Sequence, residues 1–300
     1  MKNILFNLSG KIDQRIVEAL TAIKKEADTL DIAFCVVGAF ARDIIMKHCY
    51  GIKPRRMTVD IDLAINIADW EQFDKLIGAL IGTGQFSPTR EPQRYLFDVI
   101  PIDIVPFGDI AGEQVKIGWP PEHKIFMSIL GFKGAFENSI MVRLNSDPEL
   151  DVKVPTLPSL AVMKLISWNE RYPERGKDAE DLLLIMHEYE HAGNFSRLYT
   201  NEPDLLKEER FDNQLASIRL LGRDMAMMSD KETAREVISI LDAETQSPHK
   251  LIIDMIRGRK IFDSNFEATN LQLEKLKQGF IEASADVLMK YGEKAPKKQG

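Results

Sequence analysis

The periodicity of apolar residues changes near residue 150, and this change limits the folds that the chain can adopt. Before that point, runs with strand character alternate with stretches that repeat every three or four residues, as in a helix. After it, the periodic stretches are mostly helical. The sequence therefore predicts an α+β fold, with a sheet flanked by helices over residues 1–150 and a helical domain over residues 151–292. The polar, basic end, residues 293–300, is expected to be a flexible tail.

The individual elements follow from the same patterns and from the glycine, proline and aspartate residues that end them. In the first half we expect helices over 12–30, 39–50 and 69–80, and strands over 33–37, 57–65 and 94–107, the last as one or two strands interrupted at Pro101. In the second half we expect helices over 160–169, 178–189, 215–228, 231–241 and 271–289.

The composition allows a sizeable core and excludes several classes of protein. The chain has 300 residues, 44% of them hydrophobic, which is enough for two domains. Its net charge of −7 argues against a surface that is basic throughout, so any contact with nucleic acid must be local. Cys35 and Cys49 are too few for a disulfide framework, and we expect reduced thiols. Because no run resembles a signal peptide or a membrane span, we expect a cytoplasmic protein without a membrane partner.

Two aspartates stand within a strand pattern, in the stretch TVDIDLAI at residues 58–65. Asp60 and Asp62 are two positions apart, so on a strand both carboxylates point to one face while apolar neighbours fill the other. Two such charges are stable if they are solvated or if a cation lies between them. Carboxylate oxygens suit magnesium, which keeps some of its waters and takes other ligands from the phosphates of a substrate. The pair therefore lies either on a solvent-exposed face at the edge of a sheet or in a magnesium site.

A third carboxylate favours the metal site. Asp103 lies between Ile102 and Ile104, and a charge in such surroundings needs a partner. Asp98 is the alternative, because a break at Pro101 would change which side of the strand each residue faces. We prefer Asp103 because its neighbours on both sides are apolar. Three carboxylates on neighbouring strands would bind two divalent ions in the arrangement that supports in-line attack on a phosphoryl group.

The strand over 33–37 ends at Gly38 and leads directly into a helix. Such a junction points free backbone N–H groups and the positive end of the helix dipole outward, which suits an anion such as phosphate. Packing alone explains most junctions of this kind. The assignment of Gly38 to a phosphate site therefore depends on the motifs around it.

Four segments in this order resemble a known superfamily. They are VVGAFARDIIM (36–46), RMTVDIDLAI (56–65), PIDIVPFGDI (101–110), and LAVMKLISW with RGKDAEDL (within 160–182). Together they resemble the nucleotidyltransferases with the DNA polymerase β type of palm. More narrowly, the chain is similar to the bacterial nucleotidyltransferases grouped with the AbiEii toxins of toxin–antitoxin systems. The resemblance covers residues 30–230 and implies a mixed sheet of the nucleotidyltransferase type.

The resemblance implies roles for the residues that match its motifs. Gly38 and Ala39 would hold the nucleotide phosphates, whereas Asp60, Asp62 and Asp103 would bind magnesium, with two ions expected. The superfamily usually has Gly-Gly or Gly-Ser where this chain has Gly38 and Ala39. The predicted phosphate-binding turn therefore lacks a hydroxyl group that could face the phosphate, or the conformational freedom of a second glycine.

Further residues match the family in its later motifs. Arg42 and Asp43 match an ARD segment that helps to shape the nucleotide site in the tRNA-end and poly(A) enzymes, although an ordinary helix ion pair is the alternative. Lys164 and Lys177 match lysines that contact the nucleotide, and Asp178 matches an aspartate needed for activity. Lysine suits polyphosphate, but both residue types are also common on solvated helix surfaces. Weaker candidates of the same kind are Arg171, Arg175 and Asp181.

The stretch HEYEH fits the H-E-x-x-H pattern of zinc proteases, with His187 and His191 one helical turn apart. A zinc protease needs a third ligand downstream, and residues 192–200 contain neither histidine nor carboxylate. We therefore interpret this stretch as the polar end of a helix.

These motifs predict a magnesium-dependent enzyme that moves a nucleoside monophosphate from an NTP to an acceptor and releases pyrophosphate. The toxin-like resemblance favours RNA, such as a tRNA 3′ end, or a protein as the acceptor, and it implies an antitoxin partner. A small molecule such as an aminoglycoside is an alternative acceptor. From a different class of protein, a non-catalytic nucleotide-binding protein on the same fold is also consistent with the sequence.

Overall fold

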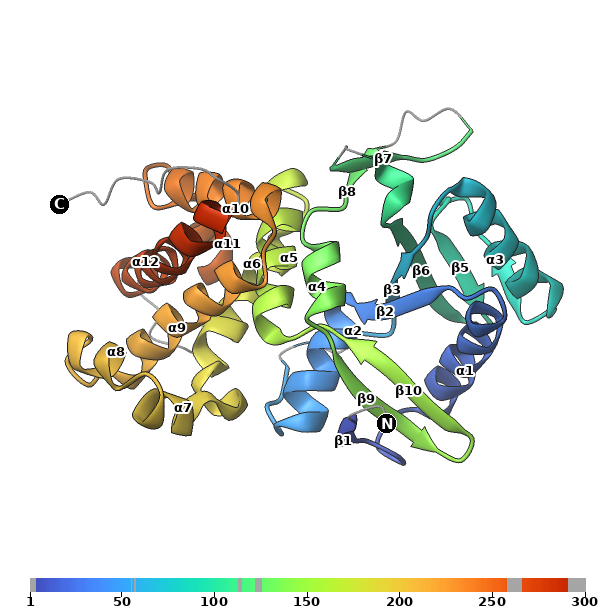
Figure 1. Cartoon of the computed structure of the whole chain (residues 1–300), viewed down its shortest axis with the longest axis horizontal. Helices are drawn as coiled ribbons and strands as arrows, with labels where there is room; N and C mark the ends of the chain where they lie inside the picture. The colour runs from blue at the N-terminus through green and yellow to red at the C-terminus, as the bar shows by residue number, and fades with distance from the viewer. Residues whose placement is uncertain are drawn as a thin grey trace. The chain divides into compact units, whose positions relative to one another are not determined.

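The structure of the protein is a computed structural model that describes residues 4–54, 56, 58–112, 115–121, 126–257 and 266–290, the last range with side chains up to residue 284. The chain forms two compact units, Met1–Thr156 and Leu157–Gly300 (Figure 1). The first unit contains the strands, and the second is helical.

A mixed sheet forms the centre of the first unit. Within its described residues, eight strands pair in the order β1-β9-β10-β2-β3-β6-β5-β4. Their bounds are β1 (Ile4–Asn7), β2 (Ala33–Val37), β3 (Ile61–Asn66), β4 (Phe86–Pro88), β5 (Arg94–Phe97), β6 (Ile100–Phe107), β9 (Ile140–Ser146) and β10 (Glu149–Val154). A separate ribbon pairs β7 (Lys116–Gly118) with β8 (Phe126–Ser128). In the middle of the sheet, β3 is antiparallel to β2 and parallel to β6.

Four α-helices of the first unit lie within the described residues. They are α1 (Gln14–Thr29), α2 (Gly38–Asp43), α3 (Trp70–Gly82) and α4 (Phe132–Glu137), and α2 continues as a π-helical turn over Ile44–Cys49. Asp69 ends the loop before α3, and its side chain accepts a hydrogen bond of 2.8 Å from the backbone N–H of Gln72. This bond satisfies one of the free N–H groups in the first turn, and it confirms the predicted cap.

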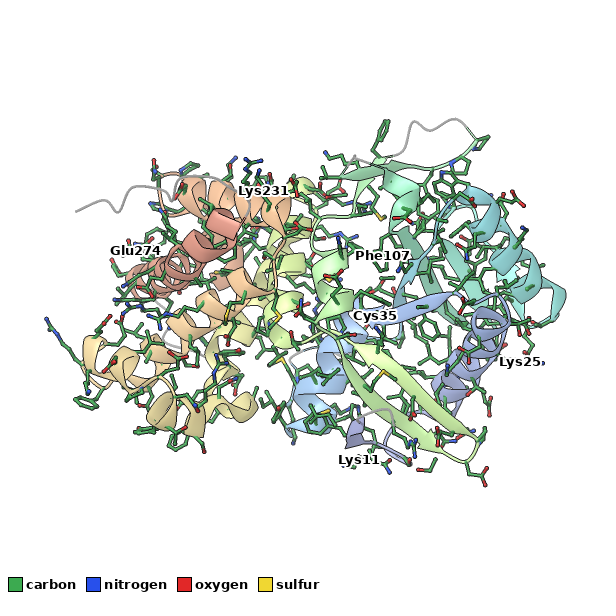
Figure 2. All side chains as sticks on the ribbon, viewed as in Figure 1. Lys11, Lys25, Cys35, Phe107, Lys231 and Glu274 are labelled. Carbon is green, nitrogen blue, oxygen red and sulfur yellow. The ribbon has the colours of Figure 1, made fainter. Side chains whose placement is uncertain are left out.

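The two faces of the sheet are covered differently. Tyr95 points to the face opposite Arg94, and burial together with the charge of Asp74 on α3 raises its pKa to about 12. That face is therefore covered by α3, and by α1, which packs against α3. On the other face, the ring of Phe107, labelled in Figure 2, packs against Phe136 of α4. This contact lies at the end of β6.

The structure corrects two details of the predicted elements. The strand expected over 57–65 begins only at Ile61. The expected break at Pro101 is wrong, because Pro101 lies inside β6 and the chain turns instead at Asp98, which has a left-handed φ of +52°. The predicted domain boundary after residue 150 falls inside β10, and the first compact unit ends after this strand, at Thr156.

The described part of the second unit is built from helices. They are α5 (Leu157–Glu170), α6 (Gly176–Glu188), α7 (Phe195–Thr200), α8 (Pro203–Glu208), α9 (Asn213–Met227), α10 (Lys231–Glu244), α11 (Lys250–Ile256) and α12 (Phe266–Lys290), with a π-helical turn over Glu190–Asn194. The long helices α9 and α12 pack closely, since a Cβ atom on Gly279 would lie 1.8 Å from the carbonyl oxygen of Arg219. Glycine at this position lets the two backbones touch. None of the described helices has the length and apolar character needed to cross a membrane.

Candidate active site

Asp62 and Asp103 lie side by side on neighbouring strands. They are register partners in the parallel pair of β3 and β6, and residues in register on adjacent strands point to the same face of a sheet. On its other side, Asp62 pairs with Val37, the last residue of β2 before α2 begins. The sheet thus brings two of the three predicted metal ligands together next to the predicted phosphate-binding turn.

Asp60 precedes β3 and lies near the guanidinium of Arg94, which also contacts Asp103. Arg94 on β5 is the register partner of Asp103. Its guanidinium donates two hydrogen bonds to that carboxylate, Nε to Oδ1 at 2.7 Å and Nη2 to Oδ2 at 2.9 Å. The same Nη2 lies 3.8 Å from Oδ2 of Asp60. Hydrogen bonding to Asp103 raises the pKa of Arg94 above its ordinary value, despite partial burial, so the group stays charged.

Arg94 lies in none of the sequence motifs that predict site residues. Its position nine residues before Asp103 becomes meaningful only once the turn at Asp98 folds β5 back along β6. The rejected alternative, Asp98 itself, is exposed in that turn. Asp103, not Asp98, is therefore the carboxylate that lies beside Asp62.

Gly38 touches the carboxylate of Asp62. A Cβ atom built on Gly38 would lie 1.9 Å from Oδ2 of Asp62, and the residue has a left-handed φ of +69°. Both features require glycine, because an L side chain here would be strained and would also collide with the carboxylate. Ala39 follows in the first turn of α2 and is half-buried. The glycine thus sets the close approach of the turn to Asp62.

Replacing Gly38 with alanine is expected to lower the free energy of unfolding by at least about 1–2 kcal/mol, because of the positive φ and the collision with Asp62. Chemical unfolding of the full chain measures this change. Gly78→Ala is the matched control. Gly78 lies inside α3, and no neighbouring atom lies within 4 Å of the place that a methyl group would take, so alanine should be neutral or should stabilise the protein by about 0.5–1 kcal/mol. Equal stability of the two variants would contradict the close contact at Gly38.

The carboxylates fit a divalent cation by their chemistry. Asp60, Asp62 and Asp103 offer the hard oxygen ligands that magnesium prefers, and two of them are adjacent in register. Among the side chains that the structure describes, no three His, Cys, Asp or Glu residues are grouped closely enough to hold a metal ion. Both oxygens of Asp103 accept hydrogen bonds from Arg94. The assignment of these three residues as metal ligands stays a prediction.

Arg42 and Asp43 form a buried pair. Arg42 is 1% exposed, and its Nε and Nη2 donate hydrogen bonds of 2.9 and 2.6 Å to Oδ1 of Asp43. Nη2 also donates a bond of 3.3 Å to the backbone oxygen of Arg56. These contacts give the pair a packing role, and a role for Arg42 in the nucleotide site stays a prediction.

In the second unit, Lys164 and Asp178 belong to one cluster. Nζ of Lys164 lies 2.6 Å from Oδ1 of Asp178 and 3.0 Å from Oδ2 of Asp181, and Ser167 donates a hydrogen bond of 2.9 Å to Asp178. Burial by itself would lower the pKa of Lys164, but the two carboxylates outweigh it and raise the pKa. Asp181, which the sequence treated as a weak candidate, is thus part of the cluster. Lys177 is exposed on the surface of α6.

The HEYEH stretch lies at the end of α6. His187 is within hydrogen-bonding distance of Gln272, its Nε2 lying 3.0 Å from Oε1, and the chain leaves helical geometry at Ala192 and Gly193. The geometry agrees with a polar helix end.

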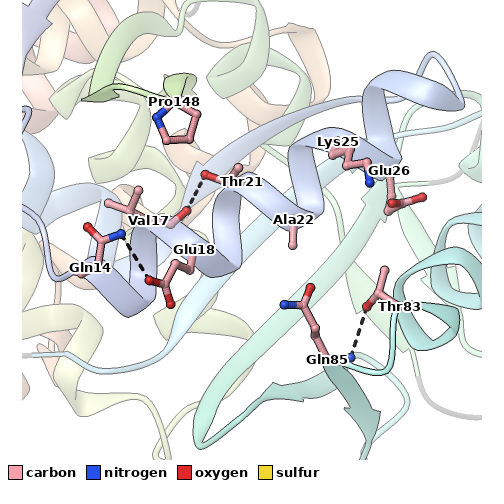
Figure 3. A pocket seen from close by; sticks show the side chains of 10 residues that line it. All are labelled: Gln14, Val17, Glu18, Thr21, Ala22, Lys25, Glu26, Thr83, Gln85 and Pro148. Atoms are coloured by element: carbon pink, nitrogen blue, oxygen red, sulfur yellow. Dashed lines mark hydrogen bonds between the residues drawn. The ribbon is translucent and has the colours of Figure 1, made fainter.

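A cavity of about 550 Å³ lies along α1. Figure 3 shows the side chains that line it, among them Val17, Thr21 and Lys25 on α1, together with Gln85 and Pro148. None of the predicted site residues lines this cavity, so it is separate from the site at Asp62 and Asp103.

Three solved structures match the chain only weakly. The antibiotic-resistance factor ANT(2'')-Ia has 14% identity and a TM-score of 0.37, covering 66% of this chain and 98% of its own. The Thermotoga maritima CCA-adding enzyme in complex with tRNA has 14% identity and a TM-score of 0.26, covering 96% and 89%. The Rhodothermus marinus CdnE c-UMP-AMP synthase has 12% identity and a TM-score of 0.26, covering 95% and 94%. At such scores these likenesses carry no argument.

A family model provides the stronger comparison. None of the curated proteins matches this chain. The model described as "Nucleotidyl transferase AbiEii toxin, Type IV TA system" matches residues 21–250, well over half of the chain. This range includes Gly38, Asp62, Asp103 and the Lys164 cluster, and it confirms the family expected from the sequence. The protein is therefore a nucleotidyltransferase of the AbiEii toxin family.

Proposed function

We propose that the protein moves a nucleoside monophosphate from an NTP to an acceptor hydroxyl group with the help of magnesium, and that pyrophosphate is released. The observation that carries this proposal is the pairing of Asp62 with Asp103 on adjacent parallel strands, with Gly38 in contact with Asp62. Adjacent carboxylates beside a strand–glycine–helix turn suit magnesium and the phosphates of a nucleotide at the same time.

Each predicted site residue of the first unit has a role in the proposed reaction. Asp60, Asp62 and Asp103 hold the cations, which would neutralise charge on the transferred phosphate and on the leaving pyrophosphate. The backbone N–H groups at Gly38 and Ala39 face the β- and γ-phosphates. Asp103 accepts the proton of the attacking hydroxyl group once one of its oxygens is released by Arg94. In this proposal Arg42 helps to shape the nucleotide site.

Lys164 and Lys177 are the residues of the second unit to which the family resemblance assigns contact with the nucleotide. Asp178 fixes the ammonium group of Lys164 through the 2.6 Å contact. Magnesium at the carboxylates and lysine side chains would both neutralise negative charge on phosphate. Both contributions are electrostatic, as is usual for phosphoryl transfer.

The acceptor that we favour is RNA, such as a tRNA, or a protein, because the family is one of toxins. An antitoxin that binds this chain in the cytoplasm is part of the same proposal. A small-molecule acceptor and a non-catalytic nucleotide-binding protein remain the alternatives, the latter because Ala39 stands where the superfamily usually has glycine or serine.

Incubation with each α-labelled NTP and magnesium tests the function, with total RNA, purified tRNA and a protein lysate as separate acceptors. We expect label on one class of acceptor and pyrophosphate in equal amount. Label on none of them, with NTP still bound in calorimetric titration, would favour the non-catalytic alternative. Label on an added aminoglycoside instead would favour the small-molecule alternative.

A further inference from the structure

Arg94 holds the position that a cation would need at Asp103. Its two hydrogen bonds, 2.7 and 2.9 Å long, use both carboxylate oxygens, and its Nη2 reaches to 3.8 Å from Asp60. A bidentate guanidinium–carboxylate pair is the strongest of the ordinary charge-assisted hydrogen bonds. Arg94 is thus the positive charge that the described structure places between two of the three predicted metal ligands.

A divalent ion and this guanidinium compete for the same oxygens. A metal bound to Asp103 would take at least one oxygen that Arg94 now uses, and two positive charges in contact repel each other. Since Asp103 is only 16% exposed at its side chain, few other directions of approach to its oxygens are available. Full metal loading therefore requires that Arg94 move.

Arg94 has both the room and a second partner for such a movement. Its side chain is 31% exposed, and Nε lies 3.7 Å from Oε2 of Glu91, in the turn just before β5. Glu91 is itself 56% exposed, so the pair can form in solvent. A rotation of the guanidinium toward Glu91 would free Asp103 and keep the arginine paired.

We propose that Arg94 occupies the cation position at Asp103 while the enzyme is free of metal, and yields it by turning to Glu91 when a divalent ion binds. This inference rests on the proposed function, because it takes Asp60, Asp62 and Asp103 as the metal ligands. Arg94 is a positioning residue: it lowers the affinity for metal and keeps Asp103 in place between reactions.

Manganese titration of the full chain tests this inference, with free Mn²⁺ followed by its electron paramagnetic resonance signal. Arg94→Gln removes the competing charge, so we expect its Kd for Mn²⁺ to be about tenfold lower than that of the wild type. Arg94→Lys keeps the charge but loses the bidentate contact, so its Kd should lie between those of the wild type and Arg94→Gln. This variant replaces Arg94→Gln in the test if the glutamine variant folds poorly. Glu91→Gln removes the second partner and should raise the Kd.

Arg143→Gln is the matched control. Arg143 makes an equally bidentate pair with Asp151, at 2.8 and 3.0 Å, on the hairpin of β9 and β10. Its loss removes the same kind of bond away from the predicted ligands, and the Kd for Mn²⁺ should stay at the wild-type value. A lower Kd in this variant as well would mean that the effect is general charge, and would overturn the role of Arg94.

The outcomes separate this inference from the proposed function. Suppose that the wild type binds Mn²⁺ and that Asp62→Asn does not. If the Kd of Arg94→Gln is then the same as that of the wild type or higher, the inference is overturned while the metal site stands. If Arg94→Gln binds Mn²⁺ with a clearly lower Kd than the wild type, and Asp62→Asn abolishes binding, the inference and the metal-dependent function are both supported. Absence of binding in the wild type and in Arg94→Gln overturns the inference together with the metal-dependent part of the proposed function.

Discussion

Replacing Asp62 with asparagine is expected to abolish nucleotide transfer while the protein stays folded. Asparagine has nearly the same shape, so it still fits against Gly38, but it lacks the charge that a divalent ion needs. Loss of several kcal/mol of transition-state stabilisation corresponds to a rate about a thousandfold lower. The initial rate of pyrophosphate release, measured with the labelled NTP and its acceptor, checks the size of the effect.

Asp98→Asn is the control for this prediction. Asp98 is exposed in the turn between β5 and β6, and its left-handed φ of +52° is well tolerated by asparagine. The variant removes the same charge from the same sheet, at a turn away from the predicted ligands, so it should keep the wild-type rate. Turnover that survives in Asp62→Asn, or that is lost equally in Asp98→Asn, would contradict the assignment of Asp62.

Replacing Lys164 with methionine is expected to destabilise the second unit by about 3–5 kcal/mol, because two buried carboxylates would lose the positive charge between them. Asp178 and Asp181 are each 3% exposed, and both contact the ammonium group. Methionine preserves most of the volume of the side chain, so the loss comes from charge and hydrogen bonding. Urea unfolding of the full chain, followed by far-UV circular dichroism, gives the change.

Lys177→Met provides a matched comparison on the neighbouring helix. Lys177 is exposed on α6, next in sequence to Asp178, and its replacement should change the free energy of unfolding by less than about 0.5 kcal/mol. The combined change Lys164→Met, Asp178→Asn and Asp181→Asn should recover much of the stability but no transfer activity. If Lys164→Met alone costs no more than Lys177→Met, the buried cluster does not stabilise the unit.

Much of the fold follows from local patterns. The strand over 33–37 and the helix that Asp69 caps were predicted from periodicity and capping alone, and the structure contains both. The five long helices expected in the second half are also present, as α5, α6, α9, α10 and α12. Such elements satisfy their backbone hydrogen bonds locally or present one clear apolar face, so their signal lies in consecutive residues.

Other elements gave little local signal. The hairpin of β9 and β10 was not predicted, although it supplies two of the neighbouring strands in the sheet. The helices α7, α8 and α11 are too short for a periodic pattern to stand out, with six, six and seven residues. The turn at Asp98 was misplaced to Pro101 because proline more often ends a strand than lies within one.

The sequence by itself determined which residue types the site offers: glycine at the end of a strand, paired aspartates and a third aspartate among apolar residues. Only the tertiary structure decided how they meet. Strand register placed Asp103 beside Asp62, and the hairpin brought Arg94 onto both oxygens of Asp103. The first contact depends on pairing between strands about forty residues apart and the second on the place of the turn between β5 and β6, and a one-residue shift of register would turn each carboxylate to the opposite face.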